Sequence, residues 1–250
     1  MTSTYKDHFS GHATSYQKFR PTYPDEMFEY LASLAPRKEL AWDCATGNGQ
    51  AAISLSNHFS QIIATDASEK QIANAIPSSD VKYQVANAEH TQINDSSVDL
   101  ITVAQALHWF DIAAFYQEAQ RVLTSNGVLA VWSYRFLSVS QDLDSAVYYL
   151  YKDILDPYWP AERKLVEEGY ANVDFPFKSV SVPPFNMTAE WNFSQLLGYL
   201  STWSAVERYK AEKGSDPLLI VKDTLRDMWG DVDIAKQIQW PLSIKVGIKQ

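Results

Sequence analysis

Short apolar runs alternate with stretches of helical periodicity through the first half of the chain. Five runs are each followed by turn residues, which predicts strands at 40–44, 61–65, 81–86, 98–103 and 128–132. Between them, Ser68 with Gln71 three residues later predicts a capped helix, and Asp111 predicts the start of another that Asn126-Gly127 ends. This alternation predicts an α/β fold with a doubly wound, mostly parallel sheet and helices on both faces.

The pattern changes after residue 132. Helical periodicity covers 141–155, 194–213 and 216–228, whereas 178–182 and 240–248 alternate like strands. We therefore expect one domain of 250 residues: a core at 24–135, a helical cap at 136–239 with one core strand near 178–182, and a final antiparallel strand at 240–250, for about seven strands in all. A cap over strand ends predicts an enclosed site for a small ligand.

Composition narrows the class of protein. The 46% hydrophobic and 20% charged residues are typical of a globular chain, and no run approaches the roughly 20 apolar residues of a membrane helix. A net charge of -9 argues against nucleic acid as a partner. The N-terminus lacks a signal-peptide core, and the single Cys44 forms no internal disulfide, so a cytoplasmic protein is expected. No metal site is expected, because His8 and His12 have no third ligand nearby.

The turn after the first predicted strand carries the strongest chemical signal. Gly47 and Gly49 let a ligand approach the backbone, and the amides of the following helix favour an anionic or accepting group. Asp66 ends the next strand 19 residues after Gly47, a spacing typical of a carboxylate that binds ribose hydroxyls. A nucleoside cofactor is indicated. Gly47-x-Gly49-x-x-Ala52 also fits a relaxed dinucleotide motif, but Asp43 suits a cofactor that bears an ammonium group.

Several separated motifs together resemble one family. The segments 43–49, Asp66, 87–89, 98–101 and 105–110 resemble the cofactor motifs of class I S-adenosylmethionine-dependent methyltransferases of the type 11 branch. Segments 16–24, 108–110 and 202–209 resemble, more narrowly, the subgroup that contains trans-aconitate methyltransferases. The resemblance implies a Rossmann-like fold, S-adenosyl-L-methionine as cofactor, and an N-terminal lid segment at 1–23. Ala45 departs from the family pattern, which has glycine there; a positive φ would cost Ala on the order of 1 kcal/mol.

The resemblance also implies which residues contact the cofactor. They comprise the glycine-containing loop with Asp43, the ribose-binding acid, the turn at the adenine edge, the loop beside the methionine moiety and two residues of the lid: Tyr16, Arg20, Asp43, Ala45, Thr46, Gly47, Asn48, Gly49, Asp66, Ala67, Asn87, Ala88, Glu89, Gln105, His108 and Trp109. Tyr16 and Arg20 also fit an ordinary surface helix. His108 is a candidate weak base, a cofactor contact or a structural histidine.

Candidates for the methyl acceptor's site come from the strand end and the cap. Trp132 and Arg135 lie at the end of the fifth predicted strand, and Trp203 and Arg208 lie in the cap. Either arginine could pair with an acidic substrate or simply be solvated. Aromatic residues of the cap such as Trp191, Phe193 and Tyr199 either line the substrate pocket or belong to the hydrophobic core. The resulting hypothesis is methylation of a small-molecule acceptor, plausibly a carboxylic acid, by a monomer or weak dimer. The alternatives are an NAD-dependent oxidoreductase and a non-catalytic cofactor-binding module.

Overall fold

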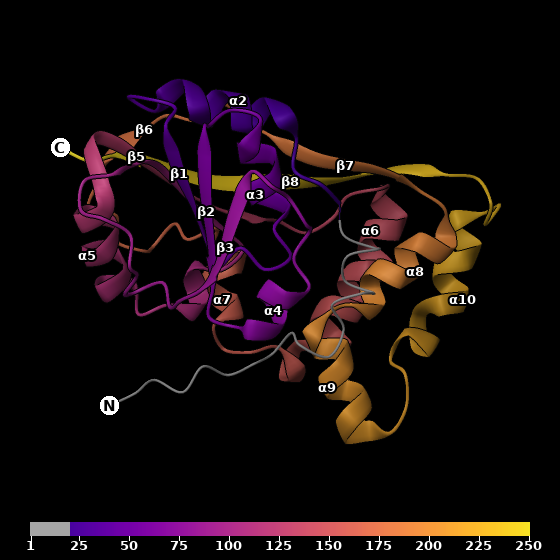
Figure 1. Cartoon of the computed structure of the whole chain (residues 1–250). Helices are drawn as coiled ribbons and strands as arrows, with labels where there is room; N and C mark the ends of the chain where they lie inside the picture. The colour runs from indigo at the N-terminus through magenta and orange to yellow at the C-terminus, as the bar shows by residue number, and fades with distance from the viewer. Residues whose placement is uncertain (1–20) are drawn as a thin grey trace.

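The computed structural model describes residues 21–250 as an eight-stranded sheet with helices on both faces and a cap at one end (Figure 1). The strands are β1 Leu40–Cys44, β2 Gln61–Asp66, β3 Val81–Val85, β4 Val98–Ala104, β5 Leu123–Tyr134, β6 Lys178–Val180, β7 Asn186–Trp191 and β8 Lys236–Ile248. Their order is β3-β2-β1-β4-β5-β8-β6, with β7 paired to β8. The first five are parallel, and β8 is antiparallel to its neighbours.

Helices and single turns connect the strands. The α-helices are α2 Asp25–Leu34, α3 Gln50–Ser56, α4 Glu69–Ala73, α5 Ile112–Val122, α6 Gln141–Tyr148, α7 Arg163–Glu167, α8 Phe193–Ser201, α9 Ser204–Lys213 and α10 Leu218–Trp229. Shorter turns are η1 Leu107–Trp109, the π-helical η2 Tyr149–Ile154 and η3 Asp156–Tyr158. The doubly wound α/β fold predicted from the sequence is confirmed.

Alternation along the strands explains the two layers of helices. In β1, Ala41 packs with α2 and α3 on one face, and Trp42 packs with α5 and α7 on the other. The predicted caps form: Asp111 Oδ1 accepts from the Ala114 amide at 3.1 Å and starts α5, and Ser68 Oγ accepts from the Gln71 amide at 3.3 Å and starts α4. Local sequence therefore fixes where these helices begin.

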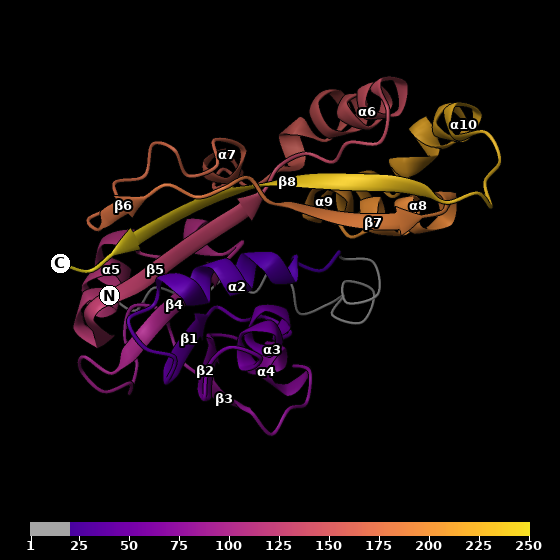
Figure 2. The same ribbon diagram turned by 90° about the horizontal axis from the view of Figure 1, so that it is seen from above.

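The cap differs from the prediction in two places. The final strand begins at Lys236, not at residue 240, and Asn186–Trp191 forms the strand β7 where only helices were expected. The first half of β8 runs past the parallel sheet and pairs with β7, while its second half pairs with β5 and β6 (Figure 2). Ile238 and Trp240 on that extension are buried among the cap helices. One long strand thus belongs to both the cap and the core.

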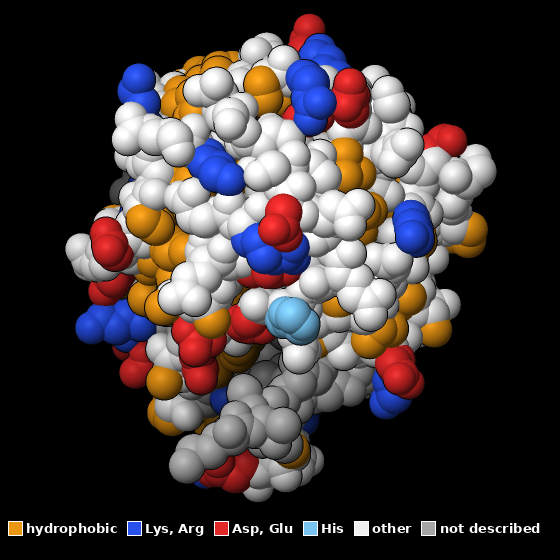
Figure 3. Space-filling model, turned by 60° about the vertical axis from the view of Figure 1, so that its left-hand side comes forward, with side chains coloured by type: hydrophobic (Ala, Val, Ile, Leu, Met, Phe, Trp, Pro, Cys, Tyr) orange, Lys and Arg blue, Asp and Glu red, His pale blue; other side chains and the backbone are white. Residues whose placement is uncertain are grey.

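The surface of the described chain is mixed in charge. On the face shown in Figure 3, acidic and basic side chains are interspersed, so that face has no continuous basic area. Among the described residues, no helix combines the length and apolar character needed to cross a membrane.

Candidate active site

The loop between β1 and α3 is built from backbone in the left-handed region. Ala45, Gly47 and Gly49 have φ of 55°, 58° and 87°. Ala45 therefore has the positive φ that is strained for a residue with a Cβ. A Cβ at Gly49 would lie 3.1 Å from ring carbons of Tyr83, whereas a Cβ at Gly47 would meet nothing within 4 Å. Space is open beside Gly47, where a ligand can approach the backbone.

Asp43, on β1, anchors this loop through hydrogen bonds of its carboxylate. Its Oδ2 accepts a hydrogen bond from the Thr46 hydroxyl at 2.5 Å, and its Oδ1 accepts one from the Thr102 hydroxyl on β4 at 2.7 Å. The side chain is buried, and burial raises the pKa of Asp43 to about 6. The carboxylate therefore joins the loop to the sheet and puts buried negative charge beneath it.

Asp66 links the carboxyl ends of two strands. Its Oδ2 accepts from the Gly47 amide and its Oδ1 from the Ser68 amide, both at 2.9 Å. The backbone carbonyl of Asp66 also accepts from the Ala86 amide at 3.0 Å. The turn after β3 thus lies beside the loops that follow β1 and β2. Ala67 comes directly after Asp66 at the same strand ends. The predicted ribose-binding acid lies next to the glycine loop.

The turn after β3 places its three predicted residues differently. Asn87 is exposed, Ala88 is buried, and Glu89 Oε1 accepts from the Asp111 amide at 3.0 Å. The Glu89 carboxylate is therefore tied to the start of α5. A role for this turn in holding adenine remains a prediction.

Unpartnered donors at these strand ends fit a polar, nucleoside-containing cofactor. Asn48 Nδ2 and Gln105 Nε2 are buried and have no hydrogen-bond partner among the described residues. Gln105 itself has φ of 55°, just after β4. Buried polar groups are normally paired, so these amides indicate a missing acceptor. Together with the open backbone at Gly47, they suit the ribose, adenine and amino-acid groups of S-adenosylmethionine.

His108 lies on the short turn η1 beyond β4. Its Nδ1 is 2.9 Å from the hydroxyl of Tyr170, and its ring lies 4.5 Å from that of Trp109. Burial, with a smaller contribution from the nearby Arg163 guanidinium, lowers the pKa of His108 to about 3. The imidazole is neutral near pH 7 and is a weak base.

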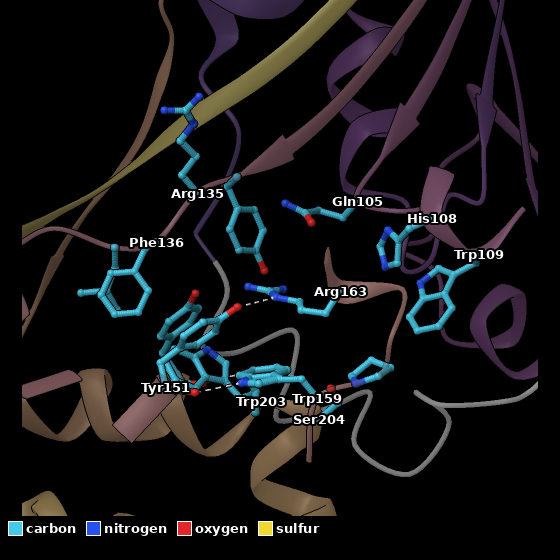
Figure 4. Close-up of a pocket in the computed structure, with 15 residues that line it drawn as sticks. Gln105, His108, Trp109, Arg135, Phe136, Tyr151, Trp159, Arg163, Trp203 and Ser204 are labelled. Atoms are coloured by element: carbon cyan, nitrogen blue, oxygen red, sulfur yellow. Dashed lines mark hydrogen bonds between the residues drawn. The ribbon is translucent and has the colours of Figure 1, made fainter. Parts of the chain in front are cut away.

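A pocket lies between the ends of β4 and β5 and the cap (Figure 4). It is lined by Gln105, His108, Trp109, Tyr134, Arg135, Phe136, Leu137, Tyr151, Trp159, Pro160, Arg163, Tyr199, Thr202, Trp203 and Ser204. Seven of these fifteen are Phe, Trp or Tyr. The pocket therefore combines flat apolar walls with a few polar groups, as small-molecule sites do.

Arg163, at the start of α7, lines this pocket and was not among the residues predicted from the sequence. Figure 4 shows it reaching among the lining residues. Its Nε donates to the Tyr151 hydroxyl at 3.0 Å, and its guanidinium carbon lies 4.9 Å from the centre of the Trp159 ring. No ion pair with a carboxylate of the described chain is formed. Arg163 sits in no recognisable motif, so only the packing of α7 against the cap could identify it.

The four predicted acceptor residues separate in the structure. Trp203 is buried and lines the pocket. Arg135 touches the rim, but its guanidinium turns away and Nε donates to Ser243 Oγ at 2.9 Å (Figure 4). Trp132 is buried against Phe28 in the core and is absent from the lining.

Arg208 is likewise not part of the pocket. Its Nη1 donates to the Tyr158 carbonyl at 3.4 Å, and Arg208 is absent from the pocket lining. Among the cap aromatics, Tyr199 lines the pocket, while Trp191 and Phe193 belong to the cap core. Tyr16 and Arg20 lie outside the described residues, so their contact with a cofactor, and the lid formed by 1–23, stay predictions.

Known proteins share this architecture. The sequence pattern of a methyltransferase domain matches residues 42–131. A protein of Dictyostelium discoideum that is named a methyltransferase is 34% identical over 233 residues, which span 92% of this chain and 89% of that protein. A protein of Saccharomyces cerevisiae named an S-adenosylmethionine-dependent methyltransferase is 24% identical over 268 residues, which span 90% of this chain and 91% of that protein.

A solved structure agrees over the whole described fold. It is titled a type II methyltransferase from Anaeromyxobacter dehalogenans, is 39% identical and superposes with a TM-score of 0.88 over 92% of this chain and 98% of that one. None of these names specifies trans-aconitate, so the narrower resemblance stays a prediction. The glycine loop by itself fits either S-adenosylmethionine or a nicotinamide dinucleotide. The similarity to methyltransferases selects S-adenosylmethionine and argues against the nicotinamide alternative. The chain belongs to the S-adenosylmethionine-dependent methyltransferases.

Proposed function

We propose that this methyltransferase acts on a small carboxylic acid and forms its methyl ester in the pocket beneath the cap. The observation that carries the proposal is Arg163, whose guanidinium reaches the pocket without a carboxylate partner from the described chain. A guanidinium recognises a carboxylate through paired, charge-assisted hydrogen bonds. Stacking on Trp159 keeps that charge oriented, and the aromatic walls suit a flat or apolar body on the acid.

The weak basicity of His108 favours the same class of acceptor. A phenol or an ammonium group must lose a proton before or during methyl transfer, whereas a carboxylate is already ionised at neutral pH. The described residues that line the pocket include no carboxylate that could serve as a base, and His108 has a pKa of about 3. An acceptor that needs no base fits these residues.

The bound cofactor would supply an electrophilic methyl group on its sulfonium. The loop from Ala45 to Gly49, Asp66 and Gln105 would hold it at the strand ends, and Arg163 would hold the acceptor from the opposite side. A carboxylate oxygen would accept that methyl group, with the cofactor's sulfur as the leaving group, so no side chain would have to remove a proton. The protein contributes alignment of the two reactants in a pocket shielded by aromatic rings. Such alignment can lower the barrier by about 7–11 kcal/mol.

The test measures formation of S-adenosylhomocysteine with benzoate, cinnamate and succinate, beside benzamide, cinnamamide, phenol and benzylamine. Turnover of acids alone is expected. Arg163→Met keeps the stacking length but removes the charge, and it should lower kcat/KM for an acid about 10- to 150-fold, the loss of one charged hydrogen-bond partner. Arg208→Met is the matched control, because that guanidinium faces the Tyr158 carbonyl outside the pocket.

Two results would overturn the proposal. One is turnover of phenol or benzylamine with none of the acids. The other is an equal loss of acid turnover in the Arg163 and Arg208 variants, since that would trace the effect to the cap as a whole.

A further inference from the structure

Tyr170 is held in an unusual and well-supported position behind His108. Gly169 and Tyr170 both have φ of 58°, so two successive residues are left-handed, and the Tyr170 side chain is fully buried. Lys245, on β8, donates through Nζ to the carbonyls of Tyr170 at 2.9 Å and Val173 at 2.8 Å. A tyrosine in the left-handed conformation costs free energy, so the contacts of Lys245 stabilise the backbone that holds this hydroxyl in place.

The direction of the hydrogen bond between Tyr170 and His108 follows from the surroundings of the hydroxyl. The Tyr170 side chain is buried, and His108 Nδ1 is the one hydrogen-bond partner of its hydroxyl among the described residues. The buried phenol proton still needs an acceptor. Among the described residues, His108 Nδ1 at 2.9 Å is the acceptor within reach.

If Tyr170 donates to Nδ1, that nitrogen carries no proton, and a neutral imidazole must carry its proton on Nε2. The ring is kept neutral by burial and by the Arg163 guanidinium. Among the described residues Nε2 has no hydrogen-bond partner, and the His108 side chain lines the pocket, so Nε2 is the ring nitrogen left to meet a ligand there. The second nitrogen therefore presents an N–H and not a lone pair.

We propose that His108 is a neutral hydrogen-bond donor to the methyl acceptor through Nε2–H, and that Tyr170 is the positioning residue that fixes this tautomer. The part that concerns the acceptor rests on the proposed function. Arg163 and His108 then present donors from two elements of the pocket, α7 and η1. A carboxylate accepts from both. A methyl acceptor that carries its own hydrogen-bond donor next to Nε2–H would instead place two donors against each other.

The first experiment reads the tautomer directly, without any acceptor. Protein labelled with ¹⁵N-histidine is studied by long-range ¹H–¹⁵N correlation of the imidazole rings between about pH 5 and about pH 8, and His108→Gln identifies the His108 signals. We expect a protonated Nε2 and an unprotonated Nδ1, unchanged across this range. Protonation of Nδ1, or titration of the ring within the range, would overturn the proposal.

The second experiment removes the phenol oxygen alone. Tyr170→Phe should convert His108 into a mixture of tautomers, because Nδ1 loses its donor. Tyr116→Phe is the matched control: its hydroxyl is also buried, has no partner among the described residues, and packs instead against Phe175 and Phe177. His108 signals that stay unchanged in Tyr170→Phe, or that change equally in the control, would contradict the positioning role.

The third experiment concerns the acceptor. With an acid that the enzyme turns over, His108→Gln retains a side-chain N–H and should keep more activity than His108→Leu, with the difference mainly in KM. Equal activities of the two variants would overturn the donor role. If no acid is turned over, the proposed acceptor class fails while the tautomer measurement still stands or falls by itself, so the two failures are distinguishable.

Discussion

The cofactor side and the acceptor side of this active site are built by different means. The cofactor side consists of loops at neighbouring strand ends, in which main-chain geometry dominates: left-handed turns at Ala45, Gly47 and Gly49, and amides bonded to Asp66. The acceptor side consists of side chains, chiefly aromatic rings and Arg163, brought together from η1, β5, η2, α7, α8 and the loops that connect them. Under the proposed function, the backbone would recognise the constant cofactor, and the side chains would recognise the variable acceptor.

This difference predicts separable effects of substitution. The loops depend on short-range sequence and on one sheet, so changes there should alter cofactor affinity. The pocket walls depend on the packing of the cap, whose core continues into Ile238 and Trp240 on β8. Changes there should alter stability and acceptor choice and leave cofactor affinity alone.

The largest effect is expected at Trp203. Its ring packs 5.6 Å from Tyr151 and 5.6 Å from Trp159, centre to centre, and is almost fully buried. Trp203→Ala should lower the free energy of unfolding in urea by about 3–5 kcal/mol, because it leaves a cavity. Affinity of the folded protein for S-adenosylhomocysteine, measured by calorimetry, should stay within about twofold. Tyr149→Ala, at an exposed cap aromatic, is the control with little effect on stability.

A parallel loss of affinity in Trp203→Ala would break the comparison. It would mean that the cap and the cofactor loops fold and bind as one unit.

The cofactor side is probed by Asp66→Asn. Removing this charged partner of the glycine loop should weaken S-adenosylhomocysteine binding by about 1.5–3 kcal/mol, or roughly 10- to 150-fold, by calorimetry. Asp80→Asn removes an exposed carboxylate just before β3 and is the matched control. Equal affinities of Asp66→Asn and the unaltered protein would show that this carboxylate serves the fold and not the ligand.

The smallest effect is expected at Ala45. Because φ is 55°, Ala45→Gly relieves strain of about 1 kcal/mol, and the greater freedom of glycine in the unfolded chain offsets part of it. We expect a gain of about 0.5 kcal/mol in the free energy of unfolding. Ala211→Gly, at an exposed position in the last turn of α9, should show the opposite sign, a loss of up to about 1 kcal/mol. A loss at both positions would show that Ala45 is not strained.

Much of the core followed from local signals. The strands, the caps at Ser68 and Asp111, and the position of Asp66 beside the glycine loop depend on residues near one another in the chain. The strand β7 was missed because its alternation covers only six residues and its partner, the first half of β8, lies far away in sequence. The start of β8 was misplaced for the same reason.

The sequence by itself determined the parallel sheet, the glycine loop with its acid, and through them the family, because apolar period and turn chemistry are local properties. Only the tertiary structure decided which cation faces the pocket. Arg135, Arg163 and Arg208 are chemically alike as sequence letters, but Ser243 draws the first away, the Tyr158 carbonyl holds the third, and Tyr151 with Trp159 hold the second toward the pocket. A long side chain is directed by its neighbours in space, and those neighbours are set by packing.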